Sequence, residues 1–367
     1  MSRWKFVFQE GLRQDNENLL QRLTQARSTG ERRLLKVYVE VTTRCDGNCL
    51  HCYFYPNRDR KEMSLAELFA LQEHLKAGGV EALTYAGGDP IVREDHLEIL
   101  RHGADLGLKQ TFCTRGWGKD LRKIEQVAEA GPEHIQFSCD PAASGFSLEE
   151  EVERILNVGE VVRHFPCHVS WVVTFLRGSN EHLVSLLDAI EQGGGKEFRI
   201  HRVLPWGRMV ENLSLIPSNE EFVTAIYEFT EMFFQRFSNG MLYVEETPGT
   251  LKQCLPQSAL KRTKMIGCPV GQTAVTIAYD GSVFLCPLLR HAELNLGESW
   301  RNVFIYWNDF QKSQPFTRSS FAGKICESCG EFDNCLGGCR CQAVVRYGKR
   351  WELDPTCNYS SLDKSSH

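Results

Sequence analysis

Short apolar runs alternate with amphipathic stretches from residue 36 to about residue 240. Each apolar run is short enough for a buried strand, and each amphipathic stretch is long enough for a helix of several turns. The apolar runs predict strands at 36–42, 82–87, 110–115, 134–140, 167–174 and 197–204. The amphipathic stretches predict helices at 64–77, 93–106, 119–130, 147–165, 180–192 and 218–237.

This rhythm indicates an α/β protein. Strands that alternate with helices form a parallel sheet with the helices outside, and six such units are too few to close an eight-stranded barrel. We therefore expect a partial (β/α)6 TIM-like barrel. Ser64 and Asn180 are candidate N-caps, and Gly78 and Gly131 are candidate helix stops.

The pattern changes near residue 240. Beyond it the chain is rich in Pro, Gly and Cys, and one hairpin signal stands out, with AVTIAY and SVFLCP on either side of Asp280-Gly281. A segment so short of apolar periodicity suits a unit held together by metal. The expected organisation is an N-terminal helical segment (1–35), the barrel (36–240), a loop-rich C-terminal domain (241–360) and a disordered tail (361–367).

Charge and composition narrow the class of protein. The chain has 367 residues, a net charge of −5 and 42% hydrophobic residues. No basic tract is long enough to predict nucleic-acid binding. No signal peptide and no apolar stretch of membrane-spanning length are present, so we expect a cytoplasmic protein without a membrane partner.

The fifteen cysteines are clustered. Three lie at 45–52 and eight at 268–357, with Cys254 just before the second group, and clustered cysteines in a cytosolic enzyme indicate metal more often than disulfides. The three isolated ones lie in apolar runs, where we expect small buried hydrophobes: Cys113, Cys139 and Cys167.

The first cysteine group has the spacing C-x3-C-x2-C and directly follows a predicted strand. Cys45, Cys49 and Cys52 supply three thiolates, whereas a [4Fe–4S] cluster needs four ligands. One iron is left open and can bind and reduce a small molecule. The carboxyl end of a strand is also where a barrel of this type gathers its catalytic groups.

With Tyr53 next, this loop resembles the cluster loop of the radical S-adenosylmethionine (radical SAM) superfamily. The second strand ends in Gly87-Gly88-Asp89-Pro90, where the family carries a Gly-Gly-Glu-Pro turn that binds the methionine amino group of SAM. The resemblance implies SAM contacts at Tyr53, Gly87, Gly88 and Asp89. The Asp carboxylate is one methylene shorter than the family's Glu, so its direct contact is the weaker part of the match.

The fourth strand adds a further match. Family members often place a Ser-x-Asp pair there against the SAM ribose, which here corresponds to Ser138 and Asp140. Alternation puts both on one face of the strand and Cys139 on the other, toward the helices. Thr114-Arg115-Gly116 stands where relatives often carry Thr-Asn-Gly, a match of little weight.

The resemblance also implies a reaction. SAM would chelate the open iron held by Cys45, Cys49 and Cys52, and one electron would cleave its sulfonium bond. The products would be methionine and a 5′-deoxyadenosyl radical that abstracts hydrogen from a substrate carbon. A reductant such as flavodoxin or ferredoxin would supply the electron.

The C-terminal cysteines resemble the SPASM domain, which binds two auxiliary iron-sulfur clusters. Of these clusters, the first would be held by Cys268, Cys286 and Cys339, and completed by Cys254 or left with an open iron. The second would be fully ligated. Cys341 is not expected to be a ligand. The ligands of the second cluster would be Cys326, Cys329, Cys335 and Cys357.

Zinc is the alternative for these cysteines. Two Cys-x2-Cys pairs can build a zinc ribbon, which would explain Cys326 and Cys329. Zinc would leave the three-cysteine loop and the Gly87-Gly88 turn unexplained, because an open three-thiolate site suits it poorly.

The predicted sixth strand carries charge on one face. Arg199 and His201 could contact a substrate carboxylate or SAM, or form a salt bridge with Glu40 or another acid. Arg202 and Arg208 are expected to be solvated. Trp206 would wall the pocket or pack under the C-terminal domain.

Three functions fit this sequence. The first is a radical SAM maturase that forms a crosslink, a thioether or an epimerised centre in a ribosomally made peptide. The second is a radical SAM enzyme acting on a small molecule or tetrapyrrole, and the third is a non-catalytic metal-binding electron carrier. Pro287 follows Cys286 where sulfatase-maturing relatives carry an acidic base, which argues against that branch. Too few residues precede residue 36 for the leader-binding domain of some relatives, so either a separate protein binds the leader or the substrate has no leader.

Overall fold

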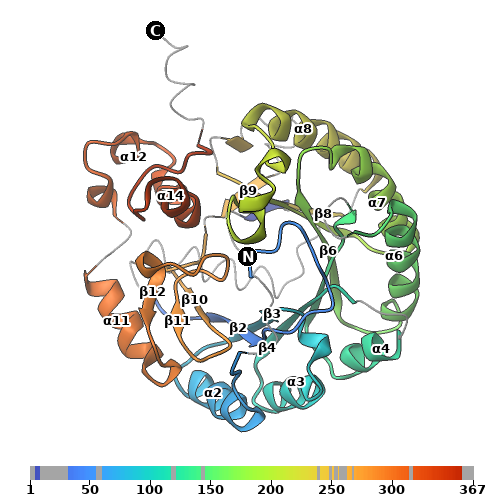
Figure 1. Cartoon of the computed structure of the whole chain (residues 1–367), viewed down its shortest axis with the longest axis horizontal. Helices are drawn as coiled ribbons and strands as arrows, with labels where there is room; N and C mark the ends of the chain where they lie inside the picture. The colour runs from blue at the N-terminus through green and yellow to red at the C-terminus, as the bar shows by residue number, and fades with distance from the viewer. Residues whose placement is uncertain are drawn as a thin grey trace.

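A computed structural model describes most of the chain. The described residues are 5–8, 32–54, 60–116, 121–141, 145–237, 240–247, 250–251, 255, 263–266, 268–313 and 317–357. A curved ten-stranded sheet has helices around its outside and an open side where the C-terminal elements lie (Figure 1). The strand order is β12-β11-β10-β2-β3-β4-β5-β6-β7-β8.

The six predicted strands are confirmed with small shifts at their ends. They pair in parallel and in sequence order. Their bounds are β2 (Lys36–Thr42), β3 (Ala82–Gly87), β4 (Lys109–Thr114), β5 (His134–Ser138), β6 (His168–Phe175) and β7 (Glu197–Arg202).

The six predicted helices are confirmed as well. Ser64 caps the first of them with a capping box, and Gly78 ends it. Asn180 is the first helical residue rather than the N-cap, which is Ser179. The bounds are α2 (Leu65–Ala77), α3 (His96–Asp105), α4 (Leu121–Glu129), α6 (Leu148–Val162), α7 (Asn180–Gln192) and α8 (Asn219–Arg236).

Two further strands extend the parallel sheet beyond the prediction. β8 (Met241–Glu245) follows α8 and pairs with β7, just past the expected end of the barrel. β10 (Ala274–Ile277) comes from the C-terminal part and pairs in parallel with β2, on the edge that the barrel strands leave open. The first barrel strand is therefore an interior strand of the sheet.

The predicted hairpin is confirmed. β10 and β11 (Val283–Phe284) pair antiparallel around the turn, and β12 (Asn295–Gly297) pairs with β11. Asp280 accepts hydrogen bonds from the amide and the hydroxyl of Ser282, and Gly281 adopts a φ of +89° that suits glycine.

Alternation along the strands separates two faces. In β2, Val37, Val39 and Val41 belong to the main core under the helices, while Glu40 and Thr42 alternate with them on the inner face. The inner face of the barrel is therefore polar at this strand.

The isolated cysteines mostly behave as expected. Cys139 is fully buried in the main core, and Cys113 is 6% exposed. Cys167 is only partly buried against that core, because it lies just before β6 begins.

The start of the chain differs from the expected helical segment. Residues 5–8 form a strand, β1 (Lys5–Phe8), that pairs antiparallel with β9 (Thr263–Ile266). The rest of the N-terminal helical prediction up to residue 31, and the predicted tail at 361–367, lie outside the described residues.

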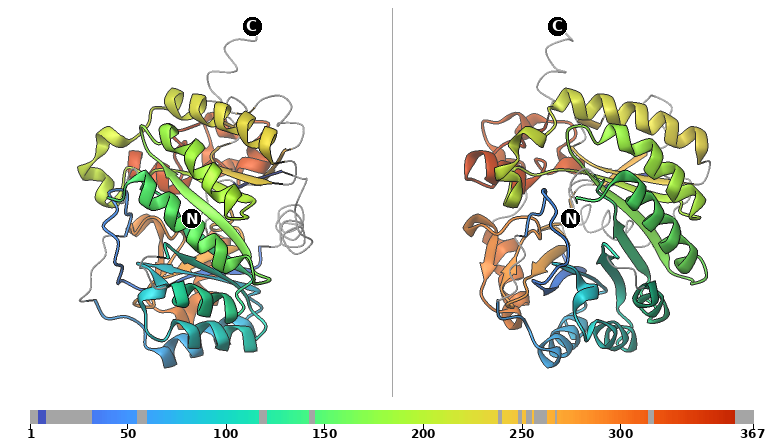
Figure 2. Two further views of the ribbon diagram at one scale, coloured as in Figure 1. Left: turned by 90° about the vertical axis from the view of Figure 1, so that its right-hand side faces the viewer. Right: turned by 45° about the vertical axis from the view of Figure 1, so that its right-hand side comes forward.

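The C-terminal part contains short elements. α11 (Val303–Ser313) packs beside β12, and three helices follow: α12 (Ile325–Ser328), α13 (Phe332–Cys335) and α14 (Arg340–Tyr347). In Figure 2 these elements lie together at one side of the barrel. No helix in the described ranges is long and apolar enough to cross a membrane.

Candidate active site

The three-cysteine loop leaves the carboxyl end of β2 and lies partly buried. The Cys52 amide donates to the Cys49 carbonyl (3.3 Å), and the Gly47 amide donates to the Cys45 sulfur (3.2 Å). Burial and the charge of Asp89 raise the pKa of Cys45 to about 12, and burial raises the pKa of Cys49 to about 11. The thiols of Cys45 and Cys49 are therefore protonated in the metal-free loop, and metal binding would displace those protons.

No three metal-ligating side chains among the described residues converge on a single point. The thiols of Cys45, Cys49 and Cys52 are nevertheless close enough to influence one another's charge. A cubane binds each thiolate at a different iron atom, so its ligands surround a volume rather than a point. The loop thus fits a cluster with one iron left open.

The glycine turn after β3 packs directly on the start of this loop. The Gly88 amide donates to the Thr42 carbonyl and the Asp89 amide donates to the Arg44 carbonyl, both at 2.8 Å. A Cβ atom on Gly88 would lie 2.1 Å from the Arg44 oxygen, and one on Gly87 would lie 2.3 Å from the Thr42 oxygen. Glycine is needed here because two backbones meet.

Asp89 is occupied by the protein itself. Its carboxylate accepts hydrogen bonds from the Thr114 hydroxyl (2.6 Å), the Arg115 amide (3.0 Å) and the Ile91 amide (3.2 Å). The side chain is 2% exposed, and burial raises its pKa. Asp89 therefore ties the ends of β3 and β4 together.

Arg115 connects the cluster loop to helix α6. Its Nη1 lies 3.8 Å from the Cys49 sulfur, and its Nη2 pairs with Glu151 at 3.0 Å in a buried salt bridge. Arg154 donates to the Arg115 carbonyl and to the Ser138 carbonyl, and so holds the ends of β4 and β5 together. The sequence showed these charges but not their pairing.

Asp140 and His51 come together at the same edge of the sheet. Asp140 accepts from the Thr174 amide (2.5 Å), and its other oxygen lies 3.6 Å from His51 Nε2. The remaining ring nitrogen of His51, Nδ1, is buried without a hydrogen-bond partner among the described residues. An orphaned buried nitrogen beside Asp140 fits a site that a polar ligand completes.

His51 was not singled out from the sequence, although it lies between two of the loop cysteines. Burial lowers its pKa, which keeps the ring neutral and leaves a nitrogen that can accept. Ser138 is partly exposed at the end of β5, and its carbonyl accepts from Arg154.

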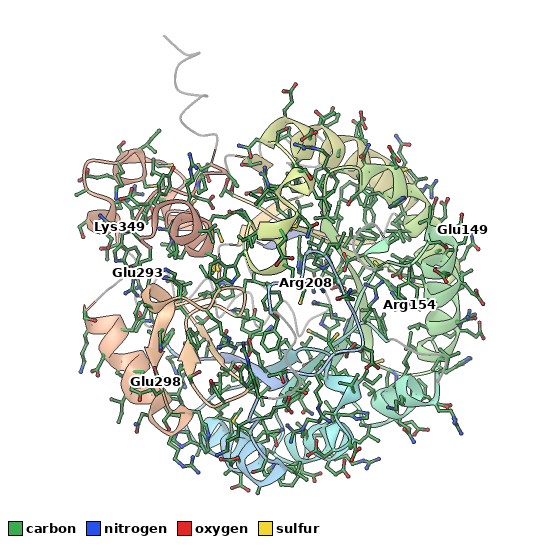
Figure 3. The ribbon with its side chains drawn as sticks, viewed as in Figure 1. Glu149, Arg154, Arg208, Glu293, Glu298 and Lys349 are labelled. Carbon is green, nitrogen blue, oxygen red and sulfur yellow. The ribbon has the colours of Figure 1, made fainter. Side chains whose placement is uncertain are left out.

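A segment after β7 closes over the cluster loop. The Arg208 amide donates to the Cys52 carbonyl (2.9 Å), and its guanidinium donates to Asn48. Figure 3 shows Arg208 near the middle of the ring of strands. A Cβ atom on Gly207 would lie 2.4 Å from the Cys52 oxygen, and this residue has a φ of +64°. Arg208 therefore clamps the loop and is not simply solvated.

The arginines of β7 form ion pairs with acidic side chains. Arg199 donates to Glu197 (2.5 Å) and stacks on Tyr243, so the predicted salt bridge forms with an acid other than Glu40. Arg202 is 6% exposed and pairs with Glu246 at 3.0 Å, which corrects the expectation of a solvated side chain.

Glu40 instead pairs with Arg290 of the C-terminal part. Burial raises the pKa of Glu40 to about 7, although Arg290 acts to lower it. Burial, followed by the charges of Glu40 and Cys52, raises the pKa of Tyr53, so Tyr53 lies close to both residues. Trp206 packs against the C-terminal core, as one of its two predicted roles required.

A second group of cysteines surrounds a hollow in the C-terminal part. Cys341, which was set aside from the sequence, is 1% exposed and faces the others. Hydrogen bonding with the thiols of Cys286 and Cys339 raises the pKa of Cys341. The Cys-x-Cys spacing was the signal that could have identified it. The cysteines that line this hollow are Cys268, Cys286, Cys335, Cys339 and Cys341.

The cysteines predicted to hold the second auxiliary cluster lie next to those of the first, since Cys335 lines the same hollow. Burial, followed by the charges of Cys357 and Cys326, raises the pKa of Cys335, so these three thiols are neighbours. The charge of Cys329 acts on Cys326 in the same direction. Cys254 lies outside the described residues.

The fold is a partial parallel barrel, and a loop of three cysteines lies at the carboxyl ends of its strands. Such a loop leaves one iron of a [4Fe–4S] cluster without a protein ligand. This combination defines a class of iron-sulfur enzymes that cleave a bound sulfonium compound. Residues 39–163 match the model of the Radical SAM superfamily. These residues therefore form a radical SAM domain, and the protein is a radical SAM enzyme, for which SAM and a [4Fe–4S] cluster are the cofactors of the family.

Similarity extends beyond that domain. The chain is 26% identical over 336 residues to the PqqA peptide cyclase of Methylobacterium nodulans, covering 88% of this chain and 86% of that protein. Its fold is similar to Streptococcus suis SuiB bound to the precursor peptide SuiA (TM-score 0.68, 16% identity, 94% of this chain and 80% of that one). It is also similar to anSMEcpe with bound AdoMet and Cp18Cys peptide (TM-score 0.66, 16% identity, 89% and 95%).

Proposed function

We propose that this radical SAM enzyme matures a ribosomally synthesised peptide. The similarity to a peptide cyclase over most of both chains carries the proposal. Two proteins of similar fold hold peptides, a precursor peptide in SuiB and the Cp18Cys peptide in anSMEcpe. When bound and reduced, the cluster and SAM would supply a 5′-deoxyadenosyl radical that removes a hydrogen atom from a substrate carbon.

The chain's own residues divide this work. Cys45, Cys49 and Cys52 would hold the catalytic cluster, and Arg115 would offset the negative charge at Cys49. The backbone amides of Gly88 and Asp89 already donate hydrogen bonds to the cysteine loop. The turn therefore has carbonyl oxygens, and not N–H donors, to offer to the amino group of SAM.

The proposed SAM contacts lie at the carboxyl ends of the barrel strands. Ser138 and Asp140 would face the ribose, and the unpartnered Nδ1 of His51 would meet a polar group of the nucleoside. Tyr53 and the Gly87-Gly88 turn would complete the pocket. Asp89 would orient the turn, because its carboxylate already accepts three hydrogen bonds.

We further propose that residues 268–357 form a SPASM-type domain with two auxiliary clusters. Cys268, Cys286, Cys339 and Cys341 would hold the first, with Cys341 in the place that Cys254 was expected to take. The second would be ligated by Cys326, Cys329, Cys335 and Cys357. Flavodoxin or ferredoxin as reductant and a separate leader-binding protein belong to the same proposal.

One experiment tests the function. The anaerobically purified enzyme is reduced with SAM, with and without short peptides encoded beside its gene, and products are analysed by mass spectrometry. We expect 5′-deoxyadenosine in both cases, and a peptide lighter by two hydrogens, or epimerised, only in the complete reaction. Turnover of a tetrapyrrole or another small molecule, with no change in any peptide, would contradict the peptide assignment.

A further inference from the structure

Arg340 lies among the C-terminal cysteines. It is the first residue of α14, follows Cys339 directly and is 5% exposed. Its side chain lines the cysteine hollow and stacks on Phe321 at 4.9 Å. Its guanidinium donates only to backbone carbonyl oxygens, those of Gly337, Gly338, Arg350 and Glu352.

No carboxylate in the described ranges lies within ion-pair distance of Arg340. The nearest acid to act on its charge, Asp354, is already used by other donors: its oxygens accept from the Cys339 amide (2.6 Å) and from the amide (2.9 Å) and hydroxyl (2.7 Å) of Thr356. Arginine stays protonated in proteins, so a buried positive charge remains. Backbone carbonyl dipoles stabilise it, and so does Asp354 from beyond ion-pair distance. Such a charge is costly unless an anion faces it.

Thiols from both cysteine sets lie close to Arg340, because Cys339 of the first set and Cys335 of the second line the same hollow as its side chain. The charges that act on it, after Asp354, are those of Cys339, Cys335 and Cys326. Cys339 belongs to the first proposed auxiliary cluster, whereas Cys326 and Cys335 belong to the second. One buried cation therefore lies between two sites whose ligated thiolates carry negative charge.

We propose that Arg340 is the shared counter-charge of the two auxiliary clusters and raises their reduction potentials. The inference rests on the auxiliary clusters of the proposed function. A reduced cluster carries one more negative charge than an oxidised one, so a fixed cation nearby stabilises the reduced form more. Because the site is buried, solvent and salt screen this interaction little.

The test compares three variants of the full-length, anaerobically assembled enzyme. Arg340→Gln removes the charge but keeps donors, Arg340→Lys keeps the charge with fewer donors, and Arg346→Gln removes an exposed charge from the same helix. Iron content is measured first. Midpoint potentials of the auxiliary clusters then come from redox titration followed by electron paramagnetic resonance.

We expect Arg340→Gln to shift the ratio of reduced to oxidised auxiliary cluster at least tenfold toward the oxidised form at a fixed potential. This corresponds to a fall of about 59 mV for a one-electron couple. Arg340→Lys should retain most of the wild-type potential, and Arg346→Gln should retain all of it. The signal of the Cys45–Cys52 cluster should be unchanged in every variant.

Other outcomes are equally informative. Unchanged potentials in Arg340→Gln with full iron would overturn the proposal. If Arg340→Gln loses auxiliary iron while Arg340→Lys keeps it, the charge is needed for assembly and the proposal stands. Loss in both variants would show that the guanidinium's hydrogen bonds hold the loop, and would overturn it. Wild-type protein without auxiliary iron would instead refute the auxiliary clusters of the proposed function themselves.

Discussion

The barrel and the C-terminal cysteine module (residues 317–357) use the same residue type in opposite ways. In the barrel, one continuous core joins strands and helices, and Cys139 serves in it as a small buried hydrophobe. In the module, the apolar clusters are small, and cysteines such as Cys326 lie inside them. Long regular elements bury enough apolar surface to hold a fold, whereas short elements need another source of stability, which metal–thiolate bonds can supply.

The largest effect should come from the catalytic loop. Replacing Cys45, Cys49 and Cys52 together by alanine should abolish 5′-deoxyadenosine formation, because no thiolates remain to hold the open-cornered cluster. Auxiliary iron and the melting temperature of the barrel should be nearly unchanged, since the loop lies outside the main core. Chromatography of the reaction products and iron analysis measure both. Residual SAM cleavage above background would refute the loop assignment; Cys167→Ala is the matched control, expected to leave cleavage intact.

The second effect is loss of order confined to the module. Replacing Cys326 and Cys329 by alanine should release auxiliary iron and expose 317–357 to proteolysis and fast amide exchange, because ligation and folding are coupled there. Strands β2–β7 should keep their protection. Iron and zinc are quantified in the same samples, since zinc as the only metal lost would favour the ribbon alternative. Unchanged metal content would contradict the second auxiliary site.

A substitution in the barrel core should lower stability without releasing metal. Leu83→Ala removes a side chain with 0% exposure and should lower the free energy of unfolding by about 2–5 kcal/mol, because it leaves a cavity. Metal content per folded molecule should not change. Leu213→Ala, at a site 57% exposed, should have little effect on either quantity. Equal losses in the two variants, measured by urea unfolding, would contradict the picture of a core-dependent barrel.

The smallest effect concerns Glu40, where the two regions meet through Arg290. Its pKa is about 7 in the folded protein and near 4.5 when unfolded, so the folded state keeps a proton that the unfolded state releases between these values. Stability should therefore fall as the pH rises from about 4.5 to 7, by about 3 kcal/mol at most. Glu40→Gln should flatten this part of the profile of melting temperature against pH, whereas the exposed Glu153→Gln should not. An identical slope in Glu40→Gln and the wild type would show that Glu40 does not titrate in this window.

The sequence predicted the barrel well because its signals are local. Apolar runs, amphipathic stretches and caps such as Ser64 each depend on neighbours a few residues away, and they placed the cysteine loop at the end of a strand. The pairing of β10 with β2 joins residues far apart in the chain, and no local pattern contains it. The ion pair of Arg202 with Glu246 was missed for the same reason, because these residues are 44 positions apart.

Within the site, residue types were easier to predict than roles. The Gly87-Gly88 turn was interpreted through a ligand, yet the structure shows that the two glycines first allow close contact with the backbone of the cysteine loop. Cys341 was set aside by spacing, and only the fold brings its thiol beside Cys286 and Cys339. Both contacts depend on three-dimensional proximity, to which the Cys-x-Cys spacing of Cys339 and Cys341 was the one local pointer.

The parallel pairing of β10 with β2 has a consequence for how the enzyme is made. The strand that carries the catalytic cysteines acquires its second neighbour only after most of the polypeptide has left the ribosome. During synthesis this strand is an unpaired edge, and its loop lacks the clamp supplied by Gly207 and Arg208. The complete surroundings of the cysteine loop therefore form only after Gly207, Arg208 and β10 have all been synthesised.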